Sequence, residues 1–198
     1  HLLKPRRKRV VLVDHNELAQ TVPGLEQAEA KDDEILREMA IARIKMLYAV
    51  QMALPGIPLL YAGDEKAVLN DYSYREDGAK RADSRWVHRS QTDWSGKKQL
   101  ASQKDIAAFV KEVIAKRKAE PLLGGSDIFI YDVQDPGVFA FRRGTVHVVA
   151  NMTDSPAQFT IDAWSENSRD LLSGRQFWNH FPQLLEPYEV RWLKEIIE

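Results

Sequence analysis

Two neighbouring carboxylates, Asp64 and Glu65, follow a short apolar run and a glycine, Gly63. The apolar run covers residues 57–62 and is typical of a short buried strand. In a barrel of parallel strands and helices, residues at the carboxyl ends of the strands form the active site. Asp64 is therefore a candidate for lining a binding cleft. Glu65 is expected to have a structural role, in which it accepts backbone hydrogen bonds and orders the following loop.

A second group of candidate side chains lies in the polar segment from residue 64 to about residue 98, which we expect to be a long irregular loop. Asp71 and Tyr72 stand in its first half, and Arg85 and Trp86 in its second. A guanidinium offers a planar fork of donors that suits two parallel hydrogen bonds to a carboxylate. A loop of this length inside a compact protein is usually functional. In the alternative interpretation, Arg85 is a surface cation and Trp86 a packing anchor.

Helices and strands of the α/β type are expected to position these residues. Residues 10–13 form a β-branched apolar run that predicts a buried parallel strand. Apolar residues at helical spacing predict an amphipathic helix over 32–53. The run at 57–62 is the second strand, so that strand, helix and strand predict a right-handed βαβ unit. A further helix is expected over 105–119.

After residue 126 the hydrophobic pattern alternates with a period of two, which indicates short strands with turns between them. These strands predict a small antiparallel β-sandwich. They are expected at residues 128–131, 138–141, 146–150, 158–161, 171–174 and 188–193.

Several aromatic and histidine side chains of the sequence have a structural and a functional interpretation. Trp164, Trp178 and Tyr188 could stack on sugars, but aromatic residues at alternating spacing are expected to belong to the core. The histidines lack the spacing of metal ligands, and each is expected to be an ordinary surface or hydrogen-bonded residue. They are His88, His147 and His180.

The composition is that of a globular protein with one domain or two small ones. The chain has 198 residues, 44% of them hydrophobic, and a net charge of −1, which gives no basic field for a nucleic-acid partner. It has no cysteine, which excludes disulfides and favours a cytoplasmic origin. No apolar run approaches the roughly 18 residues of a membrane span.

Three stretches of the sequence resemble the α-amylase superfamily, glycoside hydrolase family 13. They are residues 56–65, 69–74 and 83–89, and together they are most similar to amylosucrases. The resemblance implies the C-terminal part of a (β/α)8 barrel at about 30–120, with its active-site loop at 64–98, followed by a C-terminal β-sandwich at 121–198.

The same resemblance implies an α-retaining enzyme that transfers glucose from sucrose to an α-glucan, or hydrolyses sucrose, without a cofactor. Arg85 would pair with an Asp from elsewhere in the barrel and close the base of a glucose pocket. Asp71 is a further pocket candidate, with Tyr72, Trp86 and Asp64. The catalytic Asp and Glu of the family would lie upstream. The chain is therefore expected to contain no catalytic residue and to bind sucrose or α-glucan weakly.

Residues 1–29 resemble a different family, the manganese-dependent inorganic pyrophosphatases of the DHH superfamily. In that family a strand ends in Asp-His-Asn-Glu, as residues 14–17 do here, and the Asp ligates metal. The other ligand motifs of the family are absent, so we expect no metal site at Asp14. The pair His15-Asn16 could alternatively be a degenerate copy of the His-Asp that ends the seventh amylase-barrel strand. The favoured interpretation is a chimera with its crossover near 24–29.

Three interpretations of the whole chain therefore stand side by side. They are an amylosucrase-like fragment, a fragment of a metal-dependent pyrophosphatase, and a non-catalytic carbohydrate-binding or structural module. In the first, apolar side chains such as Leu12, Ile57 and Leu59 would lie at open barrel edges, which predicts self-association.

Overall fold

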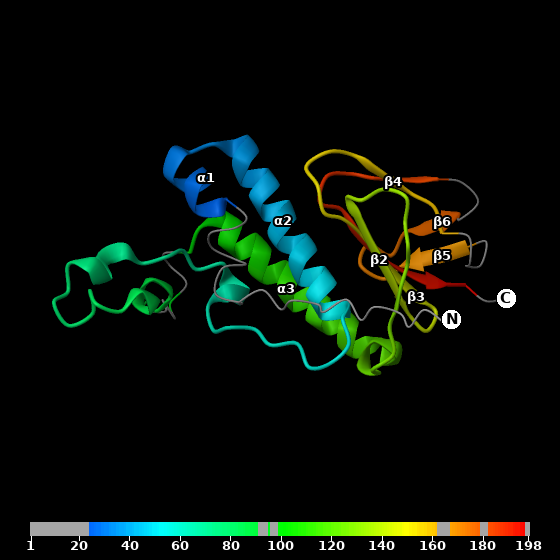
Figure 1. Cartoon of the computed structure of the whole chain (residues 1–198), viewed down its shortest axis with the longest axis horizontal. Helices are drawn as coiled ribbons and strands as arrows, with labels where there is room; N and C mark the ends of the chain where they lie inside the picture. The colour runs from blue at the N-terminus through cyan, green and yellow to red at the C-terminus, as the bar shows by residue number, and fades with distance from the viewer. Residues whose placement is uncertain (1–23, 91–94, 96–98, 162–166, 179–181, 197–198) are drawn as a thin grey trace, which may run out of the picture.

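A computed structural model describes residues 24–90, 95, 99–161, 167–178 and 182–196 of the chain. Two long helices lie in the middle of an elongated molecule, with β-structure on one side and a projecting loop at the opposite end (Figure 1). Within these ranges, no helix has the combined length and apolar character that a membrane span requires.

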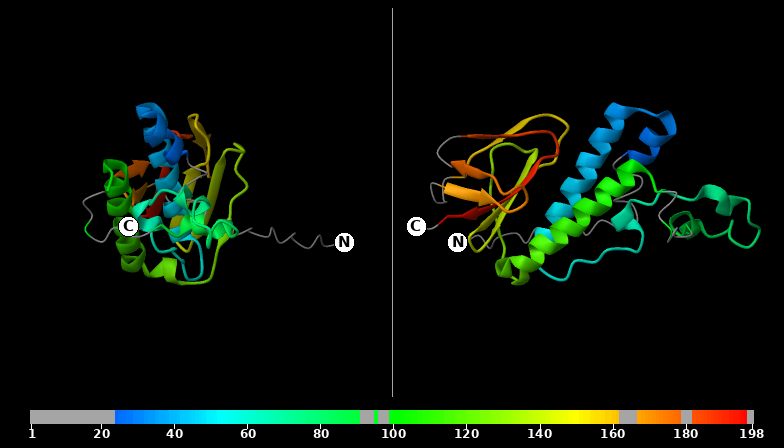
Figure 2. Two further views of the ribbon diagram at one scale, coloured as in Figure 1. Left: turned by 90° about the vertical axis from the view of Figure 1, so that its left-hand side faces the viewer. Right: turned by 180° about the vertical axis from the view of Figure 1, so that it is seen from behind.

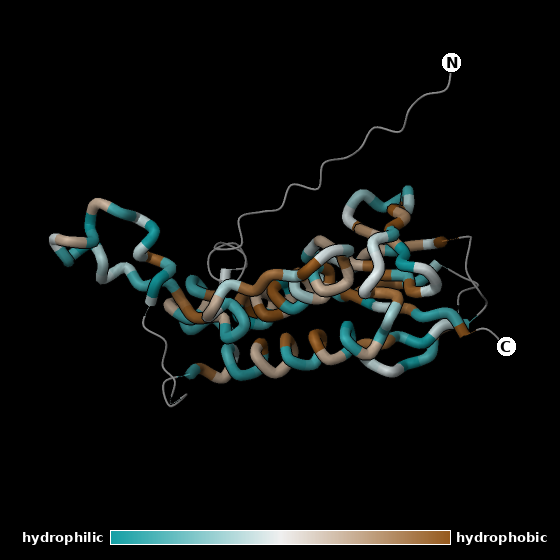
Figure 3. Tube along the Cα trace, turned by 90° about the horizontal axis from the view of Figure 1, so that it is seen from below, coloured by the Kyte–Doolittle hydropathy of each residue, from teal (hydrophilic) through white to brown (hydrophobic). Residues whose placement is uncertain are grey.

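The two long helices agree with the sequence prediction. Helix α2 (Glu34–Ala53) begins after Asp33, whose carboxylate accepts a 3.0 Å hydrogen bond from the backbone N–H of Leu36 and so satisfies a free donor at the helix start. Helix α3 (Ala101–Ala119) begins earlier than the predicted residue 105. The two helices run side by side (Figure 2), and apolar and polar residues alternate along both (Figure 3).

A short helix, α1 (Leu25–Lys31), has no counterpart among the predicted elements. It buries Leu25 completely and lies against the start of α2. Glu29 of α1 accepts a 2.6 Å hydrogen bond from the hydroxyl of Ser102 in α3. This helix therefore joins the first turns of both long helices.

The prediction of a strand at residues 57–62 is wrong, because this segment forms no strand in the structure. Its odd-numbered side chains are exposed, with Ile57 at 88%, Leu59 at 65% and Tyr61 at 40%. A parallel strand exists only through hydrogen bonds to a neighbour, and no described segment pairs with this one. The partner expected at residues 10–13 lies outside the described ranges, so the βαβ unit stays a prediction.

A six-stranded antiparallel sheet lies beside the helices, in the order β1-β2-β3-β8-β5-β6. Its strands are β1 (Phe129–Ile130), β2 (Val138–Arg143), β3 (Val146–Asn151), β5 (Asn167–Asp170), β6 (Gln176–Trp178) and β8 (Val190–Glu195). A second antiparallel sheet pairs β4 (Ala157–Phe159) with β7 (Gln183–Leu185). The predicted antiparallel β-structure is thus present as two sheets.

Within the β-structure, the prediction of a strand at residues 171–174 is wrong. The carboxylate of Asp170 accepts hydrogen bonds from the backbone N–H groups of Leu172 at 3.2 Å and Ser173 at 3.0 Å. These bonds fold the chain into a turn between β5 and β6. The apolar residues after Asp170 therefore belong to a turn, and the strand itself ends at that aspartate.

The central strand β3 is buried on both faces and separates two apolar clusters. Val148 points to the helices and belongs to a cluster with Met52 of α2 and Trp192 of β8. Val149 points the other way and packs with Leu185 of β7. Helix α2 thus covers one face of the large sheet, and the small sheet covers the other.

Two arginines surround the C-terminal end of α2. Arg117 of α3 donates hydrogen bonds to the carbonyl oxygens of Leu54 at 3.0 Å and Gly56 at 2.8 Å. Arg143 of β2 is 1% exposed and donates to the carbonyl of Ala53 at 2.8 Å. Its remaining donors bond to three further backbone carbonyls, those of Leu123, Gly125 and Asp127.

Candidate functional site

The base of the long loop is a tight turn, the 3-10 helix η2 (Asp64–Lys66), between two residues with positive φ. Gly63 has a φ of 106° and Ala67 a φ of 47°. The carboxylate of Glu65 accepts a 2.7 Å hydrogen bond from the backbone N–H of Gly63. The structural role predicted for Glu65 is therefore confirmed: it closes the turn from which the loop departs.

The predicted site residue Asp64 lies inside this turn and is only 4% exposed. Burial raises the pKa of Asp64 to about 6, and the neighbouring charge of Glu65 adds to the rise. The pKa of the buried Tyr48 phenol in α2 is also raised, mainly by burial and further by these two carboxylates. Asp64 is thus an acidic group enclosed at the base of the loop.

The outer part of the loop contains two short 3-10 helices that begin in the same way. Asp71 caps η3 (Tyr72–Arg75) by accepting a 2.9 Å hydrogen bond from the backbone N–H of Ser73. Asp83 caps η4 (Ser84–His88) by accepting a 3.0 Å bond from the N–H of Arg85. Such Asp side chains stabilise turns by replacing a backbone acceptor. The backbone N–H of Asp71 also bonds to the carbonyl of Val87 at 2.8 Å, which holds the two turns together.

A polar hollow of about 600 Å³ lies between these turns, and we call it the Trp86 hollow. It brings together two of the predicted site residues, Asp71 and Trp86. The other lining residues are Leu69, Asn70, Ser73, Tyr74, Asp77, Lys80, Arg89 and Ser90.

The Trp86 ring in this hollow carries two cations. The ammonium nitrogen of Lys80 lies 5.2 Å from the ring centre, and the guanidinium carbon of Arg89 lies 5.1 Å from it. Both distances are within the range of cation–π attraction. The sequence analysis did not single out either cation, because charged residues six positions before and three after a tryptophan follow no known motif.

The predicted site residue Arg85 pairs within its own loop. Its Nε donates to Oδ1 of Asp83 at 2.8 Å and its second nitrogen to Oδ2 at 2.9 Å. This fork holds the pKa of Asp83 at about 2. A carboxylate two residues away thus occupies both arms of the fork, and the pairing of Arg85 with an Asp from elsewhere in a barrel stays a prediction.

The predicted site residue Tyr72 connects the loop to the helices instead of lining the hollow. Its hydroxyl donates a 3.1 Å hydrogen bond to the carboxylate of Glu26 in α1. The side-chain amide of Asn70 donates to the same carboxylate at 3.2 Å, and the amide oxygen of Asn70 lies 3.1 Å from Nδ1 of His88. This network fixes the orientation of the loop relative to α1.

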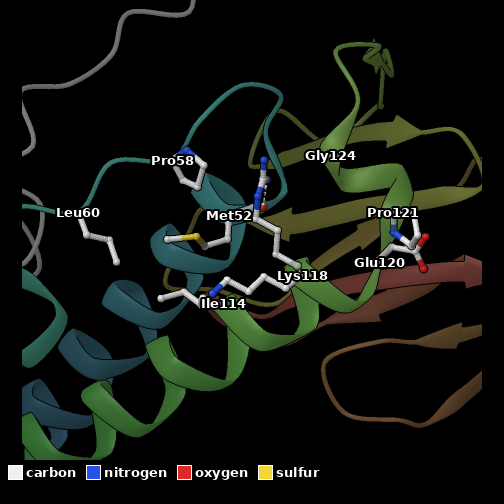
Figure 4. A pocket seen from close by; sticks show the side chains of 9 residues that line it. Met52, Pro58, Leu60, Ile114, Lys118, Glu120, Pro121 and Gly124 are labelled. Carbon is white, nitrogen blue, oxygen red and sulfur yellow. Dashed lines mark hydrogen bonds between the residues drawn. The ribbon is translucent and has the colours of Figure 1, made fainter.

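A second cavity, of about 440 Å³, is apolar and lies near the C-terminal ends of α2 and α3 (Figure 4). Leu60 and Pro58 come from the extended segment after α2, and Met52 and Ile114 from the two helices. The side chain of Arg117 also lines the cavity, and its guanidinium donates hydrogen bonds to the backbone carbonyls of Leu54 and Gly56. Its charged lining residues are Arg117, Lys118 and Glu120, and the carboxylate of Glu120 is already paired with the ammonium group of Lys194 at 2.7 Å.

The remaining candidate residues are structural, exposed or outside the described ranges. His147 is fully buried and hydrogen-bonded, with the Tyr131 hydroxyl and the Glu195 carboxylate each at 2.7 Å. Tyr188 is 6% exposed, as expected for a core residue, whereas Trp178 is 69% exposed and is not part of the core. The predictions for Asp14, His15-Asn16, Trp164 and His180 concern residues that the structure does not describe. In the part that it describes, no three His, Asp or Glu side chains form a group that could hold a metal ion.

No protein-family profile matches the chain, but its fold is found in larger solved structures. An AmyP variant in complex with maltotriose is 17% identical, with a TM-score of 0.62 over 79% of this chain and 35% of AmyP. A pullulanase from Anoxybacillus sp. LM18-11 in complex with maltotriose is 18% identical, with a TM-score of 0.59 over 88% of this chain and 25% of the pullulanase. An inactive double mutant of MutB in complex with isomaltulose is 16% identical, with a TM-score of 0.59 over 77% and 38%.

These neighbours are enzymes of glycoside hydrolase family 13, and their similarity at low identity concerns the fold. The chain spans less than two fifths of the length of each of these three proteins. The three helices and the mostly antiparallel sheets are consistent with part of such a fold. The chain therefore has the fold of part of these larger proteins.

Proposed function

We propose that this chain is the C-terminal portion of an amylosucrase-like enzyme and that its loop at residues 64–90 faces a carbohydrate. The observation that carries the proposal is the Trp86 hollow, where Asp71 and Trp86 line one polar cavity of about 600 Å³. Hydroxyl groups of a sugar need several donors and acceptors placed around one site. The hollow is lined by two carboxylates, those of Asp71 and Asp77, and by two serine hydroxyls, those of Ser73 and Ser90.

The isolated chain is proposed to bind sugar without turning it over. A retaining glycosidase needs two carboxyl groups about 5–5.5 Å apart, one as nucleophile and one as acid and base. In the hollow, Asp71 caps the N–H of Ser73 at 2.9 Å, and Asp77 pairs with Lys80 at 3.1 Å. Both carboxylates thus hold the loop in shape, and the family resemblance assigns the catalytic acids to upstream barrel strands.

Binding of sucrose and maltotriose to the purified chain tests this function. We expect weak, saturable binding that is followed by tryptophan fluorescence or by NMR shifts of the loop. Trp86→Ala and Asp71→Ala should abolish it. Trp178→Ala, which removes an exposed tryptophan far along the chain on β6, is the matched control and should leave it unchanged.

Release of glucose or fructose from sucrose is the second measurement, and we expect none. Turnover that disappears on Asp64→Ala would overturn the proposed inactivity. Failure of both sugars to bind at any accessible concentration would overturn the assignment of the loop.

A non-catalytic binding module is the second candidate function. Its support is Trp178, which is 69% exposed on β6 and presents a flat apolar surface of the kind that stacks on sugar rings. In this case Trp178→Ala would remove glucan binding, and the two loop substitutions would leave it intact. The pyrophosphatase alternative gains no support from the described residues, and phosphate release with Mn²⁺ tests it.

A further inference from the structure

The segment between α2 and the projecting loop, residues 57–61, presents apolar side chains to solvent. Its side chains alternate between half-buried and exposed with a period of two, as in a β-strand that is covered on one side. Pro58 and Leu60 line the apolar cavity beside the two long helices (Figure 4). The exposed side chains, which we call the outer face of the segment, are those of Ile57, Leu59 and Tyr61. Contiguous exposed apolar side chains of this kind mark surfaces that another chain covers.

The backbone of the segment also has unpaired hydrogen-bonding groups. In the part of the chain that the structure describes, the following N–H groups donate to no partner: those of Ile57, Leu59, Leu60, Tyr61 and Ala62. Two carbonyl oxygens are bonded within the molecule, that of Leu59 to the side-chain amide of Gln51 and that of Tyr61 to the N–H of Asp64, each at 3.0 Å. A row of unpaired N–H groups on an extended segment is an edge to which another strand can be added.

The charges around the segment favour a second copy of the same segment as the partner. No residue from 54 to 62 is charged, so two copies would place no like charges opposite each other. At one end the guanidinium of Arg117 bonds to the carbonyl of Gly56 at 2.8 Å. At the other end residues 64–66, two acids and one lysine, are net negative. An antiparallel approach therefore brings the cationic end of one copy to the acidic end of the other.

The outer face is complementary to itself in shape as well as in charge. Antiparallel pairing about a twofold axis near Leu59 places this side chain beside its own copy and places Ile57 opposite Tyr61. A β-branched residue opposite an aromatic residue is a favourable cross-strand pair. A contact that uses the same surface on both partners closes after two copies. The expected product is thus a dimer and not a chain of molecules.

We propose that residues 57–61 form the interface of a homodimer, in which the segments of two copies pair as antiparallel edge strands and bury their outer faces together. A standard interface uses about 20–30 residues from each partner, and this one is much smaller, so the dimer is a weak and reversible one. The inference goes beyond the proposed function and does not depend on it, because none of these residues lines the Trp86 hollow.

Sedimentation of the whole chain over a range of protein concentrations tests the inference, and hydrogen exchange locates the interface. We expect a monomer–dimer equilibrium, with amide protection at residues 57–62 that increases as dimer forms. Leu59→Lys should weaken dimerisation by at least about tenfold, because it removes apolar burial from both copies and places like charges side by side. Ile35→Lys is the matched control, since Ile35 is 74% exposed on α2 and lies outside the segment. It should leave the equilibrium unchanged.

A mixture of the Leu59→Lys and Leu59→Glu variants distinguishes self-pairing from other forms of association. Each variant alone should be monomeric, and the mixture should recover a dimer because opposite charges then meet at the interface. A wild-type chain that stays monomeric, a mixture that recovers no dimer, or aggregates without a defined stoichiometry would each overturn the inference.

The other possible occupant of the outer face is the apolar stretch of the same chain at residues 10–13. In that case the wild-type chain would be a monomer, and Leu59→Lys and Val11→Lys would each lower its stability in urea denaturation. This result overturns the homodimer. Sugar binding at the Trp86 hollow is measured separately, so that failure of the homodimer leaves the proposed function standing.

Discussion

The side-chain amide of Gln103 donates a 2.9 Å hydrogen bond to the backbone carbonyl of Ala67. Gln103 belongs to the first turn of α3 and is 8% exposed, and Ala67 ends the turn at the base of the projecting loop. The amide oxygen of the same side chain accepts a 3.0 Å bond from the N–H of Leu100. One side chain thus attaches the start of the loop to the helix that follows it.

Gln103→Ala is expected to destabilise the protein by about 1–3 kcal/mol, because it leaves a buried backbone carbonyl without its donor. Chemical denaturation measures the change in the free energy of unfolding. Gln27→Ala, at an exposed position of α1, is the control and should change stability by less than about 0.5 kcal/mol. Equal effects of the two substitutions would show that the amide of Gln103 does not fix the loop.

Arg143→Lys is expected to destabilise the protein by about 3 kcal/mol or more, because an ammonium cannot reproduce several bonds from one planar fork and leaves buried carbonyls unpaired. The neighbouring Arg142 is exposed and lies over the Phe129 ring at 5.1 Å. Arg142→Lys in the same strand is the control and should have a small effect, which thermal unfolding of both variants would reveal. A tolerated lysine at position 143 would contradict this role.

Asp64→Asn is expected to stabilise the protein at pH 7. The pKa of Asp64 is raised to about 6 by burial and by Glu65, so the folded state binds its proton more tightly than the unfolded state. The contribution of the neutral Asp64 carboxyl to folding stability is fully present below the pKa of about 4 that this group has in the unfolded chain. It is lost as the pH rises through the folded-state pKa of about 6. The gain from the substitution should therefore grow between pH 4 and 6, to the order of 1–3 kcal/mol.

Urea denaturation of wild type and variant at several pH values measures this difference. Asp77→Asn is the sign control, because the pKa of Asp77 is lowered, not raised. A gain for Asp64→Asn that is the same at pH 4 and pH 7 would mean that the charge of Asp64 is not penalised in the folded state.

Stability is expected to fall in mild acid through His147. Burial lowers the pKa of this imidazole, although Glu195 acts in the opposite direction. The unfolded chain therefore takes up a proton near pH 6.5 before the folded one does, and stability present above that pH is lost as the pH decreases. His147→Gln should reduce the slope of stability against pH between about 6.5 and 5.

The sequence predicts those elements whose local signals agree with their surroundings. Helix α2 combines an Asp cap with an apolar face, and β3 combines β-branched residues with flanking turn residues, so both appear close to the expected positions. Residues 57–62 have the composition of a buried strand, but a strand also needs a neighbour, and composition carries no information on the neighbour. The segment at 171–174 is apolar, yet one carboxylate, that of Asp170, folds it into a turn.

The candidate site was predictable in part for a similar reason. The long polar loop indicates a functional segment, and Asp71 and Trp86 do meet in one hollow. The partner of Arg85 could not be derived, because its donor fork fits any carboxylate within reach, and Asp83 is the one that it meets. Arg89 follows Trp86 within the same turn, and its backbone N–H bonds to the carbonyl of Trp86 at 3.0 Å, whereas Lys80 reaches the same ring from six positions earlier.

The bond from Arg143 to Ala53 crosses the boundary near residue 120 that the sequence places between the barrel part and the β-sandwich. A domain boundary placed from the sequence need not separate two parts that unfold independently, because cooperative folding units follow buried contacts. Residues 121–198 produced alone would retain Arg143 but lose its helix acceptor, and would lose the helix side of the cluster around Val148 and Trp192. Hydrogen exchange in the intact chain should then show α2 and the central strands opening together, as a single folding unit.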